Sequence, residues 1–401
     1  MKKIEYTKIK GQSVAYYGLL AGLGFLILMG LIATWYMEHN GHYVTGMNNH
    51  IVWGMPHIFA VFLIVAASGA LNVASISSVF GKKMYDPLSR LSALLAIALL
   101  AGGLVVLLLD LGRPDRLIVA ITTYNFKSIF AWNIILYTGF FAVVGAYIWM
   151  MMDHSMYKFK KKVGKVAFAW RLVLTTGTGS IFGFLVARSA YDAAIMAPMF
   201  IIMSFAFGLA IFLLILMAAY NWTGRELGDV VVTRLRNLLG VFVAASLFIT
   251  AIYHLTNLYI TQHHGVEAFI LADGGIYTNL FWIGQVFLGG LLPLALIYAP
   301  SLKTSRNTLG LASALIIIGG FCQMYVIIIG GQAYPLEIFP GYEVSNAFFG
   351  AISQYSPSLP EIMLGLSGVA VSLLLVTFAI KVLRFLPASL SDSFADPNAT
   401  K

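Results

Sequence analysis

The sequence MPHIFAVFLIVAASGALNVASISSVF, residues 55–80, decides the fold class, because it contains no Asp, Glu, Lys or Arg. About 20 apolar residues in a helix are enough to cross the hydrocarbon core of a bilayer. Nine further long apolar stretches raise the number of predicted membrane spans to ten. The ten predicted spans are 17–37, 55–80, 88–110, 128–152, 168–190, 195–221, 238–262, 277–299, 309–331 and 361–386.

The composition of the 401 residues supports this interpretation. Apolar side chains make up 60% of the chain and charged ones 10%, and the mean hydropathy is +0.86. Soluble domains carry about 25% charged residues. In lipid every backbone group must be satisfied within the spanning structure, and the short alternating strands of a barrel are not present in the sequence. We therefore predict an all-α, polytopic integral membrane protein with a single transmembrane domain over residues 1–401.

The basic residues orient the predicted helices. All but four of the 25 Lys and Arg lie at the N-terminus, in 81–90, 153–171, 222–237 and 300–308, and after residue 380. Positive charge marks the cytoplasmic side, so both termini are predicted to be cytoplasmic. The net charge of +9 thus reflects topology, and no nucleic acid partner is expected. The exceptions on the outer side are Arg113, Arg116, Lys127 and Arg188.

The N-terminal stretch 17–37 is too long for the core of a signal peptide and lacks a small-residue cleavage site, so we expect it to be the retained first span.

A faint internal similarity suggests how the spans are grouped. Met55-Pro56-His57 and Ala197-Pro198-Met199 each begin a predicted span of the same orientation, four spans apart. This pattern is typical of a parallel duplication over about 50–190 and 192–332. It predicts two four-helix bundles, spans 2–5 and 6–9, flanked by spans 1 and 10. A chance alignment of two prolines explains the similarity equally well.

Cysteine usage restricts the redox centres that the chain can hold. Cys322 is the only cysteine, whereas an iron–sulfur cluster normally takes four thiolates and structural zinc usually takes several. We therefore predict no metal site and no bound cluster. A b-type haem needs two axial ligands, and only His57 and His254 qualify. His57 lies nearer the surface than His254, so we expect no haem.

The few ionisable groups within the spans mark the candidate site, because such groups are costly in lipid. His57, Asp110 and His254 all fall in the predicted outer half, and Tyr191, Gln285 and Gln323 lie at similar depth. A quinone enters from lipid and exchanges two protons with every two electrons. A histidine can donate to its carbonyl, and a carboxylate at the membrane edge can pass protons to water. His57 alone is equally explained as a helix-start residue at the headgroup level.

The motif Leu109-Asp110-Leu111-Gly112-Arg113-Pro114 ends the third span on the outer side, where arginine is otherwise rare. Arg113 could pair with Asp110 and brace the turn before Pro114. It could instead tune Asp110, or bind an anionic surface of a docked subunit. The residues alone do not decide between these roles.

This L-D-L-G-R-P motif resembles the NrfD/PsrC family of quinone-interacting membrane subunits. The G-M-P-H-I-F start of the second span and the segment G-G-Q-A-Y-P-L-E-I-F-P before the last span are also similar to that family. The ten spans look like its ten-helix branch, and within it the DsrP subunits of DsrMKJOP complexes. The resemblance covers nearly the whole chain.

The resemblance implies a quinone-oxidoreductase subunit of the cytoplasmic membrane that acts only within a complex of sulfur or sulfite metabolism. Such a subunit binds exchangeable menaquinone near the outer face. It exchanges electrons with an extracytoplasmic, ferredoxin-like iron–sulfur subunit of the DsrO type, beside b-type and c-type cytochrome subunits. Carried over by position, His57 is a quinone donor, Asp110 a proton-transfer group and Arg113 its partner. Tyr191, His254 and Gln285 are further quinone-binding candidates.

Some features of the sequence allow other interpretations. A secondary transporter is the competing function, since ten spans and a repeat are also transporter features, although only Gly319-Gly320 resembles a broken helix. His39, His42, His263 and His264 are interpreted as solvated loop residues and not as a metal site. The loop 332–360 is long for a connector, and we expect it to cover the docking face.

Overall fold

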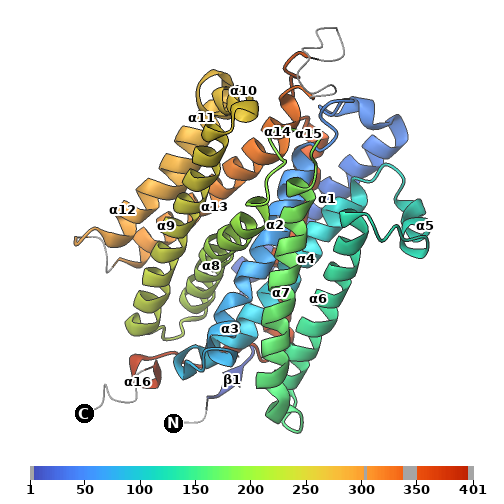
Figure 1. Cartoon of the computed structure of the whole chain (residues 1–401). Coiled ribbons are helices and arrows are strands. Elements are labelled where there is room, and N and C mark those ends of the chain that lie inside the picture. The colour runs from blue at the N-terminus through green and yellow to red at the C-terminus, as the bar shows by residue number, and fades with distance from the viewer. Residues whose placement is uncertain (1–3, 302–304, 337–349, 396–401) are drawn as a thin grey trace.

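The computed structural model describes residues 4–301, 305–336 and 350–395, and long helices dominate this part of the chain (Figure 1). This confirms the all-α fold class. The long helices are α1 (Val14–Asn40), α2 (Met55–Ala70), α4 (Ser89–Leu109), α6 (Ile129–Met152), α7 (Lys160–Gly183), α8 (Met196–Thr223), α9 (Asp229–Tyr259), α13 (Arg306–Tyr325) and α15 (Leu359–Val382).

One further span is assembled from three consecutive segments. These are α11 (Ile276–Asn279), the π-helical segment η7 (Leu280–Leu291) and α12 (Leu292–Tyr298). Helix α2 continues after a short break into α3 (Asn72–Ser78), and α13 continues through the π-helical η8 (Val326–Gly330) into α14 (Gly331–Ala333).

Short elements connect the long helices. The α-helical ones are α5 (Leu117–Thr122), α10 (His264–Ala268) and α16 (Asp392–Ala395). The 3-10 turns are η1 (His42–Val44), η2 (Lys83–Leu88), η3 (Pro114–Arg116), η4 (Tyr157–Phe159) and η5 (Thr261–His263), and η6 (Phe269–Asp273) is π-helical. Strands β1 (Tyr6–Thr7) and β2 (Leu386–Pro387) pair antiparallel, so the segments before α1 and after α15 meet at one end of the molecule.

Nine helices among the described residues are long and apolar enough to cross a membrane. The remaining expected span falls on α7, whose first half carries four lysines and Arg171 and whose second half is rich in Thr and Gly. Helix α7 nevertheless packs along α6 and α8. The predicted boundaries 168–190 are wrong for this helix. It begins at Lys160 because the basic segment is itself helical, and it ends at Gly183.

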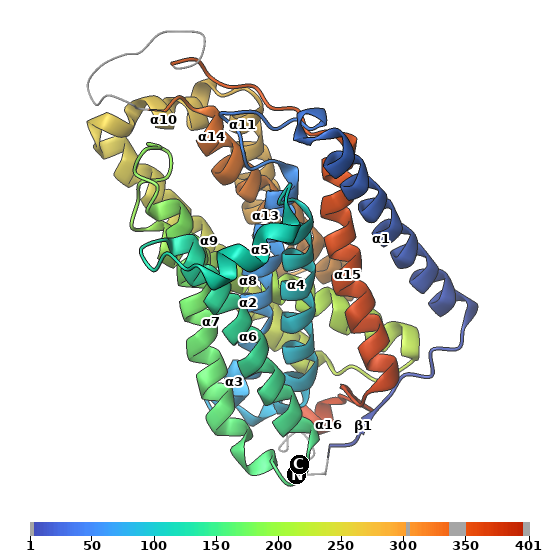
Figure 2. The ribbon, with the colours of Figure 1, turned by 90° about the vertical axis from the view of Figure 1, so that its right-hand side faces the viewer.

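The helices form two groups and a flanking pair. Helices α2, α4, α6 and α7 pack together, and so do α8, α9, the α11–α12 span and α13, while α2 and α7 join the groups through α8. Helix α1 packs chiefly against α15, which in turn lies on α4 and α2 (Figure 2). This is the predicted grouping into spans 2–5 and 6–9 with spans 1 and 10 at the flank. The proposed duplication itself stays a prediction.

Helix α2 is the centre of the bundle, because its most apolar stretch is entirely buried. Small residues allow α8 to cross it closely. A Cβ at Gly69 would lie 1.6 Å from the Ser204 carbonyl oxygen, and one at Gly208 would lie 2.1 Å from the Ala70 nitrogen. Only glycine fits on either side of this crossing, which is how membrane helices gain contact area without a hydrophobic driving force. The crossing fixes α2, and with it the position of His57.

Part of the 332–360 loop, residues 337–349, lies outside the described residues, so the expectation that this loop covers a docking face stays a prediction.

Candidate functional site

The D-L-G-R-P turn ends α4 and positions Asp110. The Asp110 N–H bonds to the Val106 carbonyl as the last helical contact, and Gly112 then adopts a left-handed φ of 63°. This conformation reverses the chain at low cost only for glycine. A Cβ at Gly112 would also lie 3.4 Å from His42 Nε2, so the turn packs directly against that imidazole. The Asp110 side chain is thereby left inside the bundle end.

His57 and Asp110 are brought together. His57 Nδ1 lies 2.9 Å from Asp110 Oδ2, and the aspartate side chain is 1% exposed whereas the histidine side chain is 24% exposed. The two groups touch without the alignment of a hydrogen bond, and neither Asp110 oxygen accepts a hydrogen bond from any described residue. A buried carboxylate normally binds several donors, because isolation in low dielectric is costly. Asp110 instead faces one imidazole, with which it can exchange a proton.

Gln332 holds the segment that leads into α2. Its side-chain oxygen accepts hydrogen bonds from the Val52 and Trp53 N–H groups at 2.9 and 3.0 Å. Its amide nitrogen donates to the carbonyls of Trp53 and Ile328 at 3.0 and 2.8 Å. Sequence reasoning noticed the G-G-Q-A-Y-P segment without assigning this residue a role. The segment packs onto the start of α2 and fixes the direction from which His57 enters the bundle.

A second clamp comes from the segment before α15. The Tyr355 hydroxyl accepts a hydrogen bond from the Met55 N–H at 2.7 Å and donates to Glu361 Oε1 at 2.6 Å. Glu361 is fully buried and also accepts from the N–H groups of Gly46 and Ser358, both at 2.8 Å. Burial and the adjacent Glu361 carboxylate raise the pKa of Tyr355, so it stays protonated as a donor.

Aromatic rings surround the histidine. The Trp53 ring stacks on His57 with centroids 6.1 Å apart and on Tyr191 at 6.5 Å, and it meets Phe182 edge-on at 5.8 Å. Phe130 lies 5.9 Å from the same tryptophan. A wall of this kind offers flat apolar contact to a planar ring system beside a polar group.

Tyr191 lies behind this wall. Its ring is completely buried, and its hydroxyl donates to the Ile328 carbonyl at 2.6 Å. A phenol engaged in this way braces the loop after α7 against η8, and its single donor is already used.

Arg113 does not pair with Asp110, so that predicted pairing is wrong. Its guanidinium makes two hydrogen bonds to Asp115, at 3.0 and 2.9 Å, and both side chains are more than half exposed. Arg113 points outward because the Gly112 turn reverses the chain between it and Asp110. The hydrogen bonds from Arg113 lower the pKa of Asp115, and those to Asp115 raise the pKa of Arg113.

Arg188, another outer exception, has a structural explanation. Its guanidinium donates to the carbonyls of Gln332 and His50 at 2.8 and 2.7 Å, which ties three loops together. Burial lowers its pKa.

His254 belongs to a separate buried network. Its Nδ1 lies 2.7 Å from Glu267 Oε2, and Asn257 donates to Glu267 Oε1 at 2.8 Å. His263 Nδ1 in turn lies 3.0 Å from Asn257 Oδ1. Glu267 is fully buried. Sequence reasoning missed it, because the segment after α9 was expected to be an open loop. The signal was a carboxylate within helical reach of two histidines in a segment without basic residues.

The solvated-loop interpretation is therefore wrong for two of the four outer histidines. His263 is buried in this network, and His42 presents an Nε2 that is buried without a hydrogen-bond partner among the described residues. His264 is exposed and bonds to the Leu258 carbonyl, and His39 is exposed and stacks on Trp35.

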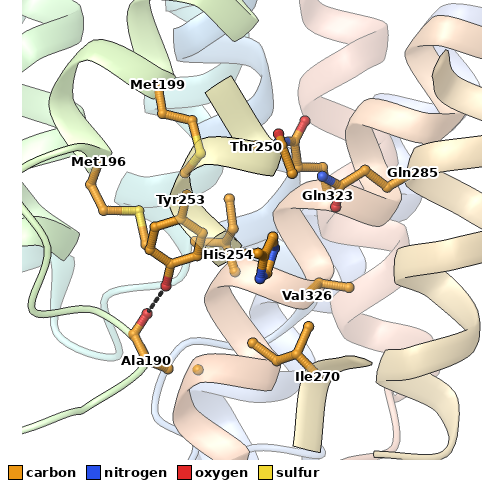
Figure 3. A pocket seen from close by; sticks show the side chains of 12 residues that line it. Ala190, Met196, Met199, Thr250, Tyr253, His254, Ile270, Gln285, Gln323 and Val326 are labelled. Atoms are coloured by element: carbon orange, nitrogen blue, oxygen red, sulfur yellow. Dashed lines mark hydrogen bonds between the residues drawn. The ribbon is translucent and has the colours of Figure 1, made fainter. Parts of the chain in front are cut away.

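A small cavity adjoins His254 (Figure 3). It holds about 20 Å³ and is lined by His254, Gln285, Gln323 and Thr250 among others. A second cavity of about 20 Å³ shares the last three of these residues and continues between α8, α9 and α13. Each is large enough for about one water molecule and too small for a quinone ring. The structure thus separates the predicted residues, with His57 and Asp110 in one group, His254 and Gln285 in another, and Tyr191 between them.

No group of three or more His, Cys, Asp or Glu side chains within residues 4–301, 305–336 and 350–395 is arranged to hold a metal ion.

Comparison with known proteins identifies the family. The model of the polysulphide reductase NrfD family matches residues 43–335. The protein is 26% identical to the Hdr-like menaquinol oxidoreductase integral membrane subunit of Archaeoglobus fulgidus, over 96% of its own length and 97% of that relative. It is 22% identical to the NrfD homolog of Haemophilus influenzae, over 71% and 95% respectively. The menaquinone reductase integral membrane subunit of Nitratidesulfovibrio vulgaris is 20% identical, over 78% and 81%. This multi-pass membrane protein therefore belongs to the NrfD family.

Proposed function

We propose that the chain binds menaquinone or menaquinol at the outer end of α2 and α4, where His57 and Asp110 handle its protons. The observation that carries this proposal is the buried Asp110 carboxylate, which contacts His57 at 2.9 Å and accepts no hydrogen bond from the described residues. Membership of the NrfD family supports it, as do two relatives whose names specify menaquinol and menaquinone. The stacked Trp53 supplies a flat apolar contact for the quinone ring.

The proton chemistry follows from the geometry. Oxidation of a quinol releases two electrons and two protons. Because His57 Nδ1 faces Asp110, its Nε2 is left to accept a proton from a quinol hydroxyl. The imidazole then passes its Nδ1 proton to Asp110 Oδ2, and the carboxyl group releases it to water at the adjoining exposed turn. The second proton takes the same route, and quinone reduction runs these steps in reverse.

The electrons require a partner, since this chain is proposed to bind neither haem nor an iron–sulfur cluster. We propose an extracytoplasmic, ferredoxin-like iron–sulfur subunit of the DsrO type, docked over η3 and α5. None of the residues in these two elements is buried, and Ile118 and Val119 are 62% and 57% exposed next to Arg113 and Arg116. An exposed apolar patch with a charged rim is typical of a protein interface. A DsrMKJOP-like complex with b-type and c-type cytochromes, acting in sulfur metabolism, completes this proposal.

The experiment compares Asp110→Asn with Asp115→Asn in the purified complex. Asparagine at 110 keeps the shape of the side chain but cannot accept the proton, so turnover with a reduced naphthoquinone should fall by about 10²–10⁴-fold. Asp115 lies in the same turn but is 60% exposed and bound to Arg113, so its variant should stay within about twofold of the parent. Copurification of the partner subunits checks assembly. Normal quinol oxidation by an assembled Asp110→Asn complex would refute the assignment.

A further inference from the structure

A large hollow lies at the opposite end of the bundle from His57, near the end where β1 and β2 meet (Figure 1). It has a volume of about 700 Å³ and is bordered by α3, the segment 79–85, α7, α8 and α9. This volume falls in the range of small-molecule binding sites. Nothing in the proposed quinone chemistry uses it.

A buried arginine lies in the wall of this cavity. Arg171 is 0% exposed, yet it contacts no carboxylate among the described residues. Its two terminal nitrogens donate to the Ser68 carbonyl at 3.3 Å and to Asn72 Oδ1 at 3.0 Å, while Nε has no hydrogen-bond partner in the described part of the chain. A buried cation without a countercharge is costly, and arginines inside membrane proteins are normally paired. The position therefore calls for an anion that the described residues do not supply.

The same cavity carries three more cations at its rim. Lys82, Lys83 and Arg234 are exposed, and none forms an ion pair with a described residue. No Asp or Glu of the described ranges lines the cavity. The site thus concentrates positive charge from three separate parts of the chain, the turn after α3, α7 and α9.

The rest of the wall is aromatic. Phe80 and Phe168 meet edge-on with centroids 6.1 Å apart, and Phe205 and Phe242 lie 5.0 Å apart. The Arg171 guanidinium lies between these pairs, 4.9 Å from the Phe168 ring and 4.8 Å from the Phe205 ring. Flanking rings hold the guanidinium plane in place and contribute cation–π attraction. A free phosphate could use the cations but would gain nothing from the aromatic walls.

We propose that this cavity binds the headgroup of an anionic phospholipid, with the phosphate at the rim cations and the upper acyl chain against the phenylalanine walls. The phosphate supplies the countercharge that Arg171 lacks. Basic pockets between membrane helices are a recognised mode of binding anionic lipid headgroups. The bound lipid joins α3 and α7 of the first helix group to α8 and α9, so it acts as a structural ligand.

The test measures lipid binding to the full chain in detergent by native mass spectrometry. The probes are phosphatidylglycerol, phosphatidylcholine with the same acyl chains, and inorganic phosphate. The variant is Lys82→Gln/Lys83→Gln/Arg234→Gln, whose side chains are exposed and make no hydrogen bond that folding needs. The control is Lys161→Gln/Lys162→Gln/Lys165→Gln, which removes three exposed cations from α7 outside the cavity. Both variants lose the same charge, so their difference reports the cavity.

The parent and the control should retain phosphatidylglycerol more tightly than phosphatidylcholine. The cavity variant should bind it about fivefold more weakly for each cation removed, and up to about 100-fold for the three together. The thermal stabilisation that phosphatidylglycerol gives the parent should disappear in this variant. Equal losses in the two variants, or equal binding of the two lipids, would overturn the proposal. Protection by inorganic phosphate as strong as that by the lipid would also overturn it, because the ligand would then be a free anion.

Discussion

Replacing Gln332 with methionine should destabilise the chain and lower quinol turnover, because this side chain fixes the segment leading to His57. Methionine has a similar length but can make none of the four hydrogen bonds to Val52, Trp53 and Ile328. The change leaves two N–H and two carbonyl groups without their partner. At about 1 kcal/mol for each, the loss is about 4 kcal/mol. For a chain of this length that corresponds to a fall in melting temperature of about 4–8 °C.

The assay is thermal unfolding of the purified chain, together with quinol turnover in the complex. Gln332→Glu provides a finer comparison. It keeps the oxygen that accepts from Val52 and Trp53, but it places a second oxygen against the carbonyls of Trp53 and Ile328. It should therefore also be destabilised. Gln262→Met is the control, because Gln262 is exposed at the same end of the molecule. The reasoning is refuted if Gln332→Met melts within about 1 °C of this control and retains full turnover.

Three further changes test other features. Gly112→Ala should cost about 1–2 kcal/mol because φ is 63°, and should also slow turnover by shifting Asp110, as thermal unfolding and quinol kinetics would check. Gly69→Ala should abolish assembly in the membrane because its Cβ would lie 1.6 Å from the Ser204 oxygen, whereas Gly22→Ala, which meets nothing within 4 Å, should express normally. The pKa of Tyr355 is raised above its ordinary value of 10, so its contribution to stability is complete below pH 10 and is lost as the pH rises further; melting temperatures between pH 8 and 11 should fall less steeply in Tyr355→Phe.

Hydropathy predicted most of the helices, because a spanning segment must be apolar along its whole length. It placed α7 wrongly, since the Lys160–Lys165 region is helical despite its charge. The burial of α7 residues such as Arg171 depends on neighbours that no local window contains.

The candidate site was predicted in part for the same reason. His57 and Asp110 stood out because ionisable groups are rare in the spans, and their expected cooperation matches the 2.9 Å contact. Arg113 was assigned to Asp110 by its spacing along a helix, but the helix ends at Leu109 and the Gly112 turn directs Arg113 to Asp115. The contacts of Gln332 join segments about 280 residues apart in sequence, so only the tertiary structure reveals them.

The packing of α1 has a consequence for biosynthesis. Helix α1 is mostly surrounded by lipid, with 22% of its most apolar stretch buried, and its main neighbour is α15. The two touch closely at Gly30, where a Cβ would lie 2.2 Å from Ser367 Cβ. The first helix to leave the ribosome must therefore wait in the bilayer until the last one has been inserted. Release of α15 from the translocon is then the event that closes the protein.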